Sequence, residues 1–160
     1  AGRFRDKGSI TGLYTVLVDG DDMTEPVADS VRSILDGHIV LSRAIAARNH
    51  FPAIDILNSA SRVMRDIVSP RHQELAGRAR EVLARYAEAE DLINIGAYVK
   101  GSNAKIDYAI SKIDAINTFL RQNFTETDTL QHSVEQLGVV LSERKDEEPA
   151  KKNRRQSDKN

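Results

Sequence analysis

Residues 102–120 read SNAKIDYAISKIDAINTFL, and this stretch decides the fold of the second half of the chain. Four of its apolar residues recur at i, i+4, i+7 and i+14 and share one face of a helix: Ile106, Ile110, Ile113 and Leu120. Ser102 or Asn103 is suited to cap this helix, because a side-chain oxygen there accepts a hydrogen bond from a first-turn amide. We therefore predict an amphipathic helix that buries one face against other elements.

Two more helices flank this one in the sequence. Ser69 and Pro70 are typical of a helix start, with Ser as the N-cap and Pro in the first turn, and this helix is expected to run to about Ile95 and Gly96. Beyond the central helix, apolar residues again recur on one helical face, at Leu130, Val134, Leu137 and Leu141. Three amphipathic helices with short links predict a small helical bundle over residues 69–142.

The first zone, residues 8–68, mixes strand and helix. Residues 9–18 are rich in Ile, Thr, Tyr, Leu and Val and are apolar on both faces, which favours a buried strand of a covered parallel sheet. Residues 19–22 break this strand and form a turn. Pro26 then opens a helix that Asp36-Gly37 ends, so the zone is predicted to be α/β.

The composition limits the classes of function. Of 160 residues, 40% are apolar and 29% are charged, which is ordinary for a globular protein. A net charge of −1 gives no global field toward nucleic acid or an acidic membrane, and the lack of cysteine excludes disulfides and thiolate chemistry. No apolar run approaches the ~20 residues that span a bilayer. Residues 143–160 are almost all polar and mix Glu, Lys and Arg, which predicts a disordered tail.

The histidines give no metal centre. They stand apart in the sequence without ligand spacing such as HExxH, at His38, His50, His72 and His132. The chain also has no Gly-x-Ser-x-Gly elbow or Ser-His-Asp order that would indicate a nucleophilic hydrolase. We therefore expect no metal site and no covalent catalysis.

Five short segments go further, because they occur in one order. They are residues 8–11 with 21–26, then 34–43, 50–55, 59–64, and 95–102 with Asp107. Together they resemble the C-terminal part of the flagellar and type III protein-export ATPases, relatives of the catalytic subunits of rotary ATP synthases. The resemblance covers about residues 1–141, and residues 14–23 and 95–102 favour the export branch over the ATP synthase branch.

The resemblance implies a fold and an activity. Residues 1–68 would be the distal part of a RecA-like nucleotide domain, and residues 69–142 a helical C-terminal domain, followed by the tail at 143–160. The whole protein would be a cytoplasmic homohexamer, peripheral at the inner face of the cytoplasmic membrane, that hydrolyses ATP with Mg²⁺ to feed an export gate. The family's GxxxxGK[ST] loop is absent, so ATP and Mg²⁺ would be held mainly by upstream residues. The chain alone is expected not to hydrolyse ATP.

Arg62 and an adenine pocket are the implied nucleotide contacts. Arg62 matches the family's arginine finger, which reaches the nucleotide of the neighbouring subunit; the alternative is a surface arginine at a helix start, capped by Ser59 or Ser61. Phe51, beside Pro52, matches the ring that stacks on adenine; the alternative is a core phenylalanine. Ala97 and Tyr98, in the loop 95–101, would lie on the other side of the base.

The resemblance also implies partners. Asp21, Asp22, Thr24 and Glu25 would form a loop that faces the central pore and touches a stalk coiled coil, although a solvated turn is the simpler interpretation. An acidic loop would attract a basic stalk by charge. A stator or regulator protein and export chaperone–substrate complexes complete the implied partners, with no nucleic acid. The alternative function is a non-catalytic helical interaction module that binds export chaperones or stalk proteins.

Overall fold

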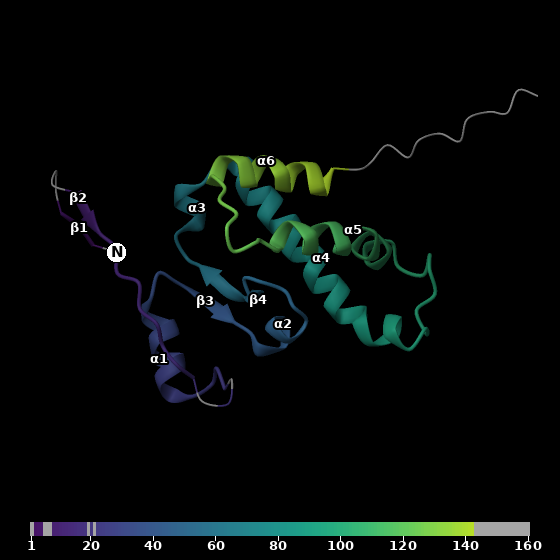
Figure 1. Cartoon of the computed structure of the whole chain (residues 1–160), viewed down its shortest axis with the longest axis horizontal. Helices are drawn as coiled ribbons and strands as arrows, with labels where there is room; N and C mark the ends of the chain where they lie inside the picture. Colours follow the sequence, from purple (N-terminus) through teal and green to yellow (C-terminus); the bar gives the residue numbers. More distant parts are fainter. Residues whose placement is uncertain (1, 5–7, 19, 21, 143–160) are drawn as a thin grey trace, which may run out of the picture.

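The computed structural model describes residues 2–4, 8–18, 20 and 22–142. Its elements in chain order are β1 (Gly2–Phe4), β2 (Gly8–Ile10), α1 (Pro26–Ile34), β3 (Gly37–Leu41), α2 (Arg43–Ala47), β4 (Ile54–Ser61), α3 (Met64–Ile67), α4 (Pro70–Asn94), α5 (Ala104–Leu120) and α6 (Leu130–Leu141). The bundle α4–α6 lies on one side, and β3, β4, α1 and α2 lie on the other (Figure 1). The predicted disordered tail and Asp21 fall outside the described residues.

The three predicted helices form, and the first two begin at predicted caps, Ser69 and Asn103. The side chains of Ser69, Asn103 and Thr129 accept first-turn amides at the starts of α4, α5 and α6. Side chains from all three helices meet in one core, composed of Leu75, Val82, Ala109, Ile116, Leu137 and Leu141. Within the described residues, no helix is both long enough and apolar enough to cross a membrane.

The buried face of α5 differs in phase from the predicted one. Ala109, Ile113 and Ile116 are buried, whereas Ile106 and Ile110 are only partly buried. The sequence pattern weighted large apolar residues, but the centre of the face is Ala109, which is fully buried. The small side chain of Ala109 lets the neighbouring helices approach α5 closely. The centre of the buried face is therefore an alanine rather than one of the bulkiest residues.

The strands β3 and β4 pair antiparallel, with a wide irregularity. Val40 pairs with Asp55 and His38 pairs with Ala60, so residues 56–59 bulge out of β4 opposite Ile39 alone. Asp55 holds the bulge from within, because its Oδ1 accepts the amides of residues 57 and 58, both at 3.0 Å. The hydroxyl of Ser59 donates to the carbonyl of Asp55 and accepts the amide of Val40. The bulge is therefore an ordered part of the strand.

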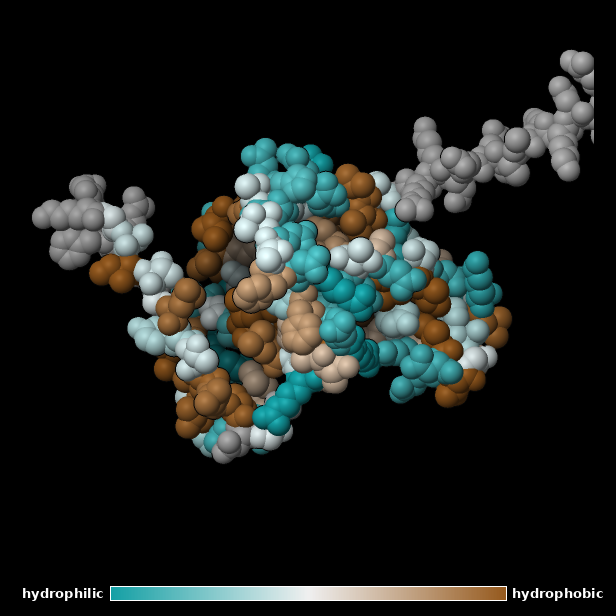
Figure 2. All heavy atoms as spheres, viewed as in Figure 1, coloured by the Kyte–Doolittle hydropathy of each residue, from teal (hydrophilic) through white to brown (hydrophobic). Residues whose placement is uncertain are grey.

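The predicted buried strand at residues 9–18 is wrong. Only Gly8–Ile10 is a strand, paired antiparallel with β1, and residues 11–18 adopt no helix or strand. Leu13 and Leu17 are more than nine-tenths exposed, and apolar side chains gather over α1 and this end of the molecule (Figure 2). Apolar sequence favours burial only where neighbouring strands exist, and the described strand pairs are both antiparallel rather than parallel.

Within the described residues, polar contacts of Arg80, Arg48 and Gln122 join the strand region to the bundle. Arg80 of α4 donates to carbonyls of β4. Arg48, after α2, lies 3.3 Å from a carboxylate oxygen of Glu90. The amide of Gln122, just beyond α5, donates to the carbonyl of Phe51 at 2.9 Å. The strand region therefore contacts the bundle at two places on α4 and at one place just beyond α5.

Two glycines offer a matched test of this packing by thermal unfolding. A Cβ at Gly37 would lie 2.7 Å from the backbone oxygen of Ala60 in β4, whereas a Cβ at the exposed Gly77 of α4 would meet open space. Gly37→Ala should lower the free energy of unfolding by about 1–3 kcal/mol through overpacking. Gly77→Ala should raise it by about 0.5–1 kcal/mol, because alanine loses less backbone entropy in a helix. Equal shifts for both variants would contradict the close β3–β4 approach.

Candidate functional site

Arg62 follows β4 directly and is tied to the end of α1. Its amide donates to the carbonyl of Asp36 at 2.8 Å, which extends the strand pairing by one residue. Its guanidinium donates to the carbonyls of Arg32 and Ser33, both at 3.1 Å. These carbonyls end α1, where the helix carries partial negative charge. Hydrogen bonds to neutral carbonyls orient the guanidinium without cancelling its positive charge, and the residue remains exposed.

The alternative of a helix-start arginine capped by serine does not fit the geometry. The helix α3 begins at Met64, and its N-cap, Val63, makes no side-chain capping bond. Ser59 is instead bonded within β3 and β4. Arg62 thus stands at a strand end held by another helix, which is a fixed position for an exposed cation.

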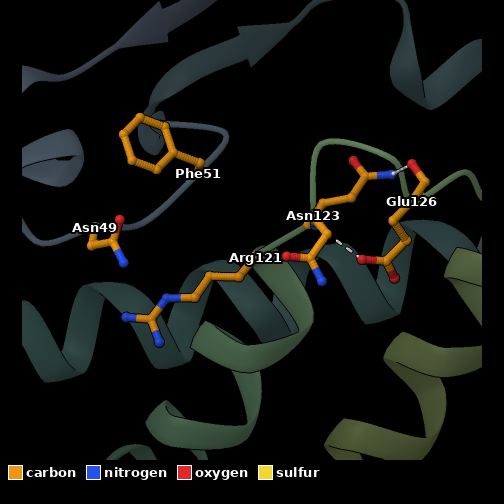
Figure 3. Close-up of a pocket in the computed structure, with 6 residues that line it drawn as sticks. Asn49, Phe51, Arg121, Asn123 and Glu126 are labelled. Atoms are coloured by element: carbon orange, nitrogen blue, oxygen red, sulfur yellow. Dashed lines mark hydrogen bonds between the residues drawn. The ribbon is translucent and has the colours of Figure 1, made fainter.

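Phe51 lines a pocket of about 300 Å³ between the α2–β4 link and the residues after α5. The lining residues are Asn49, Phe51, Arg121, Gln122, Asn123 and Glu126 (Figure 3). Phe51 is 52% exposed, which does not fit the core alternative. Glu126 fixes the opposite wall, because its Oε2 accepts the amide of Asn123 at 3.0 Å.

The pocket combines a flat ring with polar groups that can bind a heteroaromatic base. A planar base can stack on Phe51, and the side-chain amides of Asn49 and Asn123 can hydrogen bond to its edge. The wall formed by residues 121–126 is missing from the sequence prediction. The available signal was Phe124, a fully exposed aromatic ring within a polar link.

His50 adjoins the pocket and has a lowered pKa. Burial disfavours the charged imidazolium, and the positive charge of Arg121 lowers the pKa further, while the carbonyl of Leu120 acts in the opposite sense. Folding therefore favours the neutral imidazole of His50. Arg121 is the permanently charged cation that lines the pocket.

The structure does not bring Ala97 and Tyr98 to Phe51. The hydroxyl of Tyr98 lies 3.1 Å from both the carbonyl of Asn103 and Oδ1 of Asp107, at the start of α5. Phe51 lies beside the residues that follow the end of α5, and the 17-residue helix spans about 25 Å. These contacts place the loop 95–101 near the start of α5 and Phe51 near its end, and the expectation that the loop covers the same base as Phe51 stays a prediction. A nucleotide contact by Ala97 and Tyr98 likewise stays a prediction.

The segment before α1 forms a local turn. Asp22 accepts the amide of Thr24 at 2.9 Å and its hydroxyl at 2.5 Å. The hydroxyl bond is the main cause of the lowered pKa of Asp22, so this carboxylate is anionic at neutral pH. Glu25 is the N-cap residue of α1 without a side-chain capping bond. The described part of the loop thus presents the exposed Asp22 and the half-buried Glu25 at the start of α1.

The histidines do not assemble a metal or nucleophile site in the described part of the chain. No group of His, Asp and Glu there could hold a metal ion. His132 lies 2.7 Å from Asp128, but Ser133 donates to the same carboxylate rather than to the imidazole. This arrangement caps α6 and cannot activate the hydroxyl as a nucleophile.

Two family models match the chain in sequence order. Residues 1–61 match the nucleotide-binding domain of the ATP synthase alpha/beta family, and residues 68–138 match the T3SS EscN ATPase C-terminal domain. The gap between the two matches, residues 62–67, contains Arg62 and α3 (Met64–Ile67).

Named relatives agree with both matches. The chain is 52% identical to the flagellum-specific ATP synthase of Bacillus subtilis (82% of this chain, 30% of the relative) and 52% identical to the type 3 secretion system ATPase of Sinorhizobium fredii (86% and 30%). The solved assembly of EscN with its central stalk EscO, from enteropathogenic E. coli, is similar at a TM-score of 0.77 and 43% identity (86% and 32%). The chain belongs to the family of flagellar and type III secretion ATPases, and it spans about a third of the length of these relatives.

His50 gives a prediction for pH dependence. Its pKa in the folded chain lies below the ordinary 6.5, so the unfolded chain binds more protons at mildly acidic pH. The free energy of unfolding should therefore fall as the pH drops through about 6.5, and His50→Gln should flatten this part of the profile. Thermal unfolding between about pH 5 and 7.5 measures the slope. Arg121→Gln should raise the His50 pKa in an NMR titration; no change would contradict the pocket geometry.

Proposed function

We propose that this chain is the C-terminal part of a protomer of a homohexameric ATPase that hydrolyses Mg-ATP to energise flagellar or type III protein export. The observation that carries the proposal is the order of the two matches, a nucleotide-binding domain at residues 1–61 joined to an export-ATPase domain at residues 68–138. The first match indicates nucleotide chemistry, and the second indicates which branch of the family uses it.

The proposed domain boundary lies close to the gap between the two family matches. We assign residues 1–68 to the RecA-like domain, 69–142 to the helical domain and 143–160 to a charged tail. The division is supported by the N-cap at Ser69 and by the common core of α4, α5 and α6. Arg80 and Glu90 then act across the domain boundary.

Arg62 is proposed as the arginine finger for a nucleotide bound by the neighbouring protomer. Negative charge spreads over the γ-phosphoryl oxygens in the transition state, and a fixed guanidinium stabilises it. The two carbonyls at the end of α1 support this role, because they restrict the side chain in advance. A pre-oriented arginine loses less entropy when it meets the phosphate.

The adenine of the same protomer's ATP is proposed to stack on Phe51. Pro52 follows it and shapes the link into β4, and residues 121–126 form the far wall. In this proposal Mg²⁺ and the phosphates are held by GxxxxGK[ST] and acidic residues that are not among these 160. Magnesium neutralises phosphate charge when bound, and the residues of this chain supply the base contact and the finger.

The loop around Asp22, Thr24 and Glu25 is proposed to meet a central stalk. EscN has been solved in complex with its central stalk EscO, which supports a stalk partner for this chain as well. The exposed carboxylate of Asp22 and the half-buried one of Glu25 suit a basic coiled coil. A stator protein and chaperone–substrate complexes are proposed as further partners, at the cytoplasmic face of the membrane.

The finger assignment is tested in the complete ATPase that carries this chain. Arg62→Ala should leave nucleotide binding largely intact and lower kcat by on the order of 10³-fold, because the contact forms only in the transition state. Arg62→Lys should recover little activity, since lysine lacks the planar fork. Steady-state kinetics on assembled oligomers measures both.

A mixing experiment tests whether Arg62 acts across an interface. Arg62→Ala protomers are combined with protomers that retain Arg62 but lack the phosphate-binding lysine. Some activity should return at the mixed interfaces, where each protomer supplies what the other lacks. Near wild-type kcat for Arg62→Ala alone would make Arg62 a surface or packing residue.

Phe51 should behave differently from Arg62. Phe51→Ala should raise KM for ATP with a smaller effect on kcat, because stacking on the base is similar in the ground and transition states. Phe51→Tyr is the matched control and should remain close to wild type. A fall in kcat without a change in KM would place the base elsewhere.

A further inference from the structure

We propose that Arg80 of α4 is a positioning residue for Arg62, acting through the bulge of β4. Its Nη1 donates to the carbonyls of Ile56 at 2.6 Å and Ser59 at 3.1 Å, and its Nη2 donates to that of Leu57 at 3.1 Å. One guanidinium thus binds three carbonyls of the four-residue bulge at 56–59. The inference rests on the proposed finger role of Arg62.

The bulge supplies these carbonyls because it departs from the β3 ladder. Regular pairing with β3 stops at Asp55 and resumes at Ala60, so the intervening carbonyls are available to side-chain donors, and that of Asn58 lies 3.0 Å from Nε2 of His38. Asp55 and Ser59 bond the inner side of the bulge, and Arg80 bonds it from the bundle. A planar fork with several N–H groups suits three acceptors, whereas a lysine ammonium would act as a single point charge.

A short, tight path runs from the bulge to Arg62. Ala60 pairs with His38, Ser61 pairs with Gly37, and the amide of Arg62 then donates to Asp36. Gly37 approaches β4 so closely that a Cβ would lie 2.7 Å from the oxygen of Ala60. Because β3 and β4 are tightly packed here, we expect a shift of the bulge to move the end of β4, and Arg62 with it.

The other end of the contact is firmly held. Arg80 lies on α4 between the core residues Leu75 and Val82, and α4 packs in the bundle core. The helical domain therefore sets the position of the bulge, and through it the position of the finger. Displacement of a reacting group by about 1 Å can cost on the order of 100-fold in rate.

The first experiment uses the chain itself. Hydrogen exchange of the Arg62 amide, which donates to Asp36, is followed by NMR in Arg80→Ala. Exchange should accelerate by roughly tenfold or more, because several charge-assisted hydrogen bonds are lost next to it. Arg85→Ala is the matched control, since Arg85 lies on the same helix and bonds only the exposed Glu88 in the described contacts. Equal protection in the two variants would overturn the proposal.

The second experiment is a double-mutant cycle in the complete ATPase. Arg80→Ala should lower kcat by about 10- to 100-fold with nucleotide KM nearly unchanged, and Arg80→Lys should recover only part of it. In an Arg62→Ala background, Arg80→Ala should lower kcat no further, because the residue acts through Arg62. Assembly is checked by size-exclusion chromatography, and Arg85→Ala should keep wild-type kcat.

The outcomes separate the two proposals. If Arg62→Ala alone retains kcat, the finger assignment fails. If Arg62→Ala is impaired but Arg80→Ala is not, the positioning role fails and the finger stands. If the two defects multiply in the double variant, Arg80 acts independently of Arg62, which also overturns the positioning role.

Discussion

Burial of the Ala109 and Ile116 face of α5 between α4 and α6 is the constraint on which the remaining geometry depends. Both side chains are at most 1% exposed, and they contact a core shared by the three helices. Because close-packed cores do not deform continuously, the three helices move as one body. The start of α4, the Arg80 position and the end of α5 are therefore fixed relative to one another, and the strand region attaches to these points.

Backbone carbonyls left free by the fold are the second recurring feature. The end of α1 leaves carbonyls that receive Arg62, and the bulge of β4 leaves carbonyls that receive Arg80. Both sites exist because regular pairing stops there, and an unpaired carbonyl favours a cationic donor. Neither arginine needs a carboxylate for these bonds, although the Asp36 carboxylate lies near enough to Arg62 to feel its charge.

The sequence predicts the local features of the fold well and the distant contacts poorly. Helix starts at Ser69 and Asn103 follow from short-range capping chemistry, which a few adjacent residues determine. The strand at 9–18 failed because its burial depends on neighbours that a local pattern cannot supply. The phase of α5 failed because Ala109, rather than a bulky residue, marks its closest approach.

The site divides in the same way. Short motifs indicate Arg62 and Phe51, and both residues are exposed, as their proposed roles require. The wall at 121–126 was missed because it lies some 70 residues from Phe51 and meets it only through the tertiary fold. Ala97 and Tyr98 were grouped with Phe51 because of the family resemblance, and the structure places the two loops near opposite ends of α5.

The joint between the two halves differs in character from the core of the bundle. The core is apolar and close-packed, so it has one favoured arrangement. The contacts from Arg80 to β4, from Arg48 to Glu90 and from Gln122 to Phe51 are polar, directional and partly exposed. Such bonds are directional, so the position of the strand region relative to the bundle depends on their geometry rather than on apolar packing. The bundle core therefore acts on the strand end that carries Arg62 through a few named polar contacts, of which those of Arg80 lie nearest in sequence to Arg62.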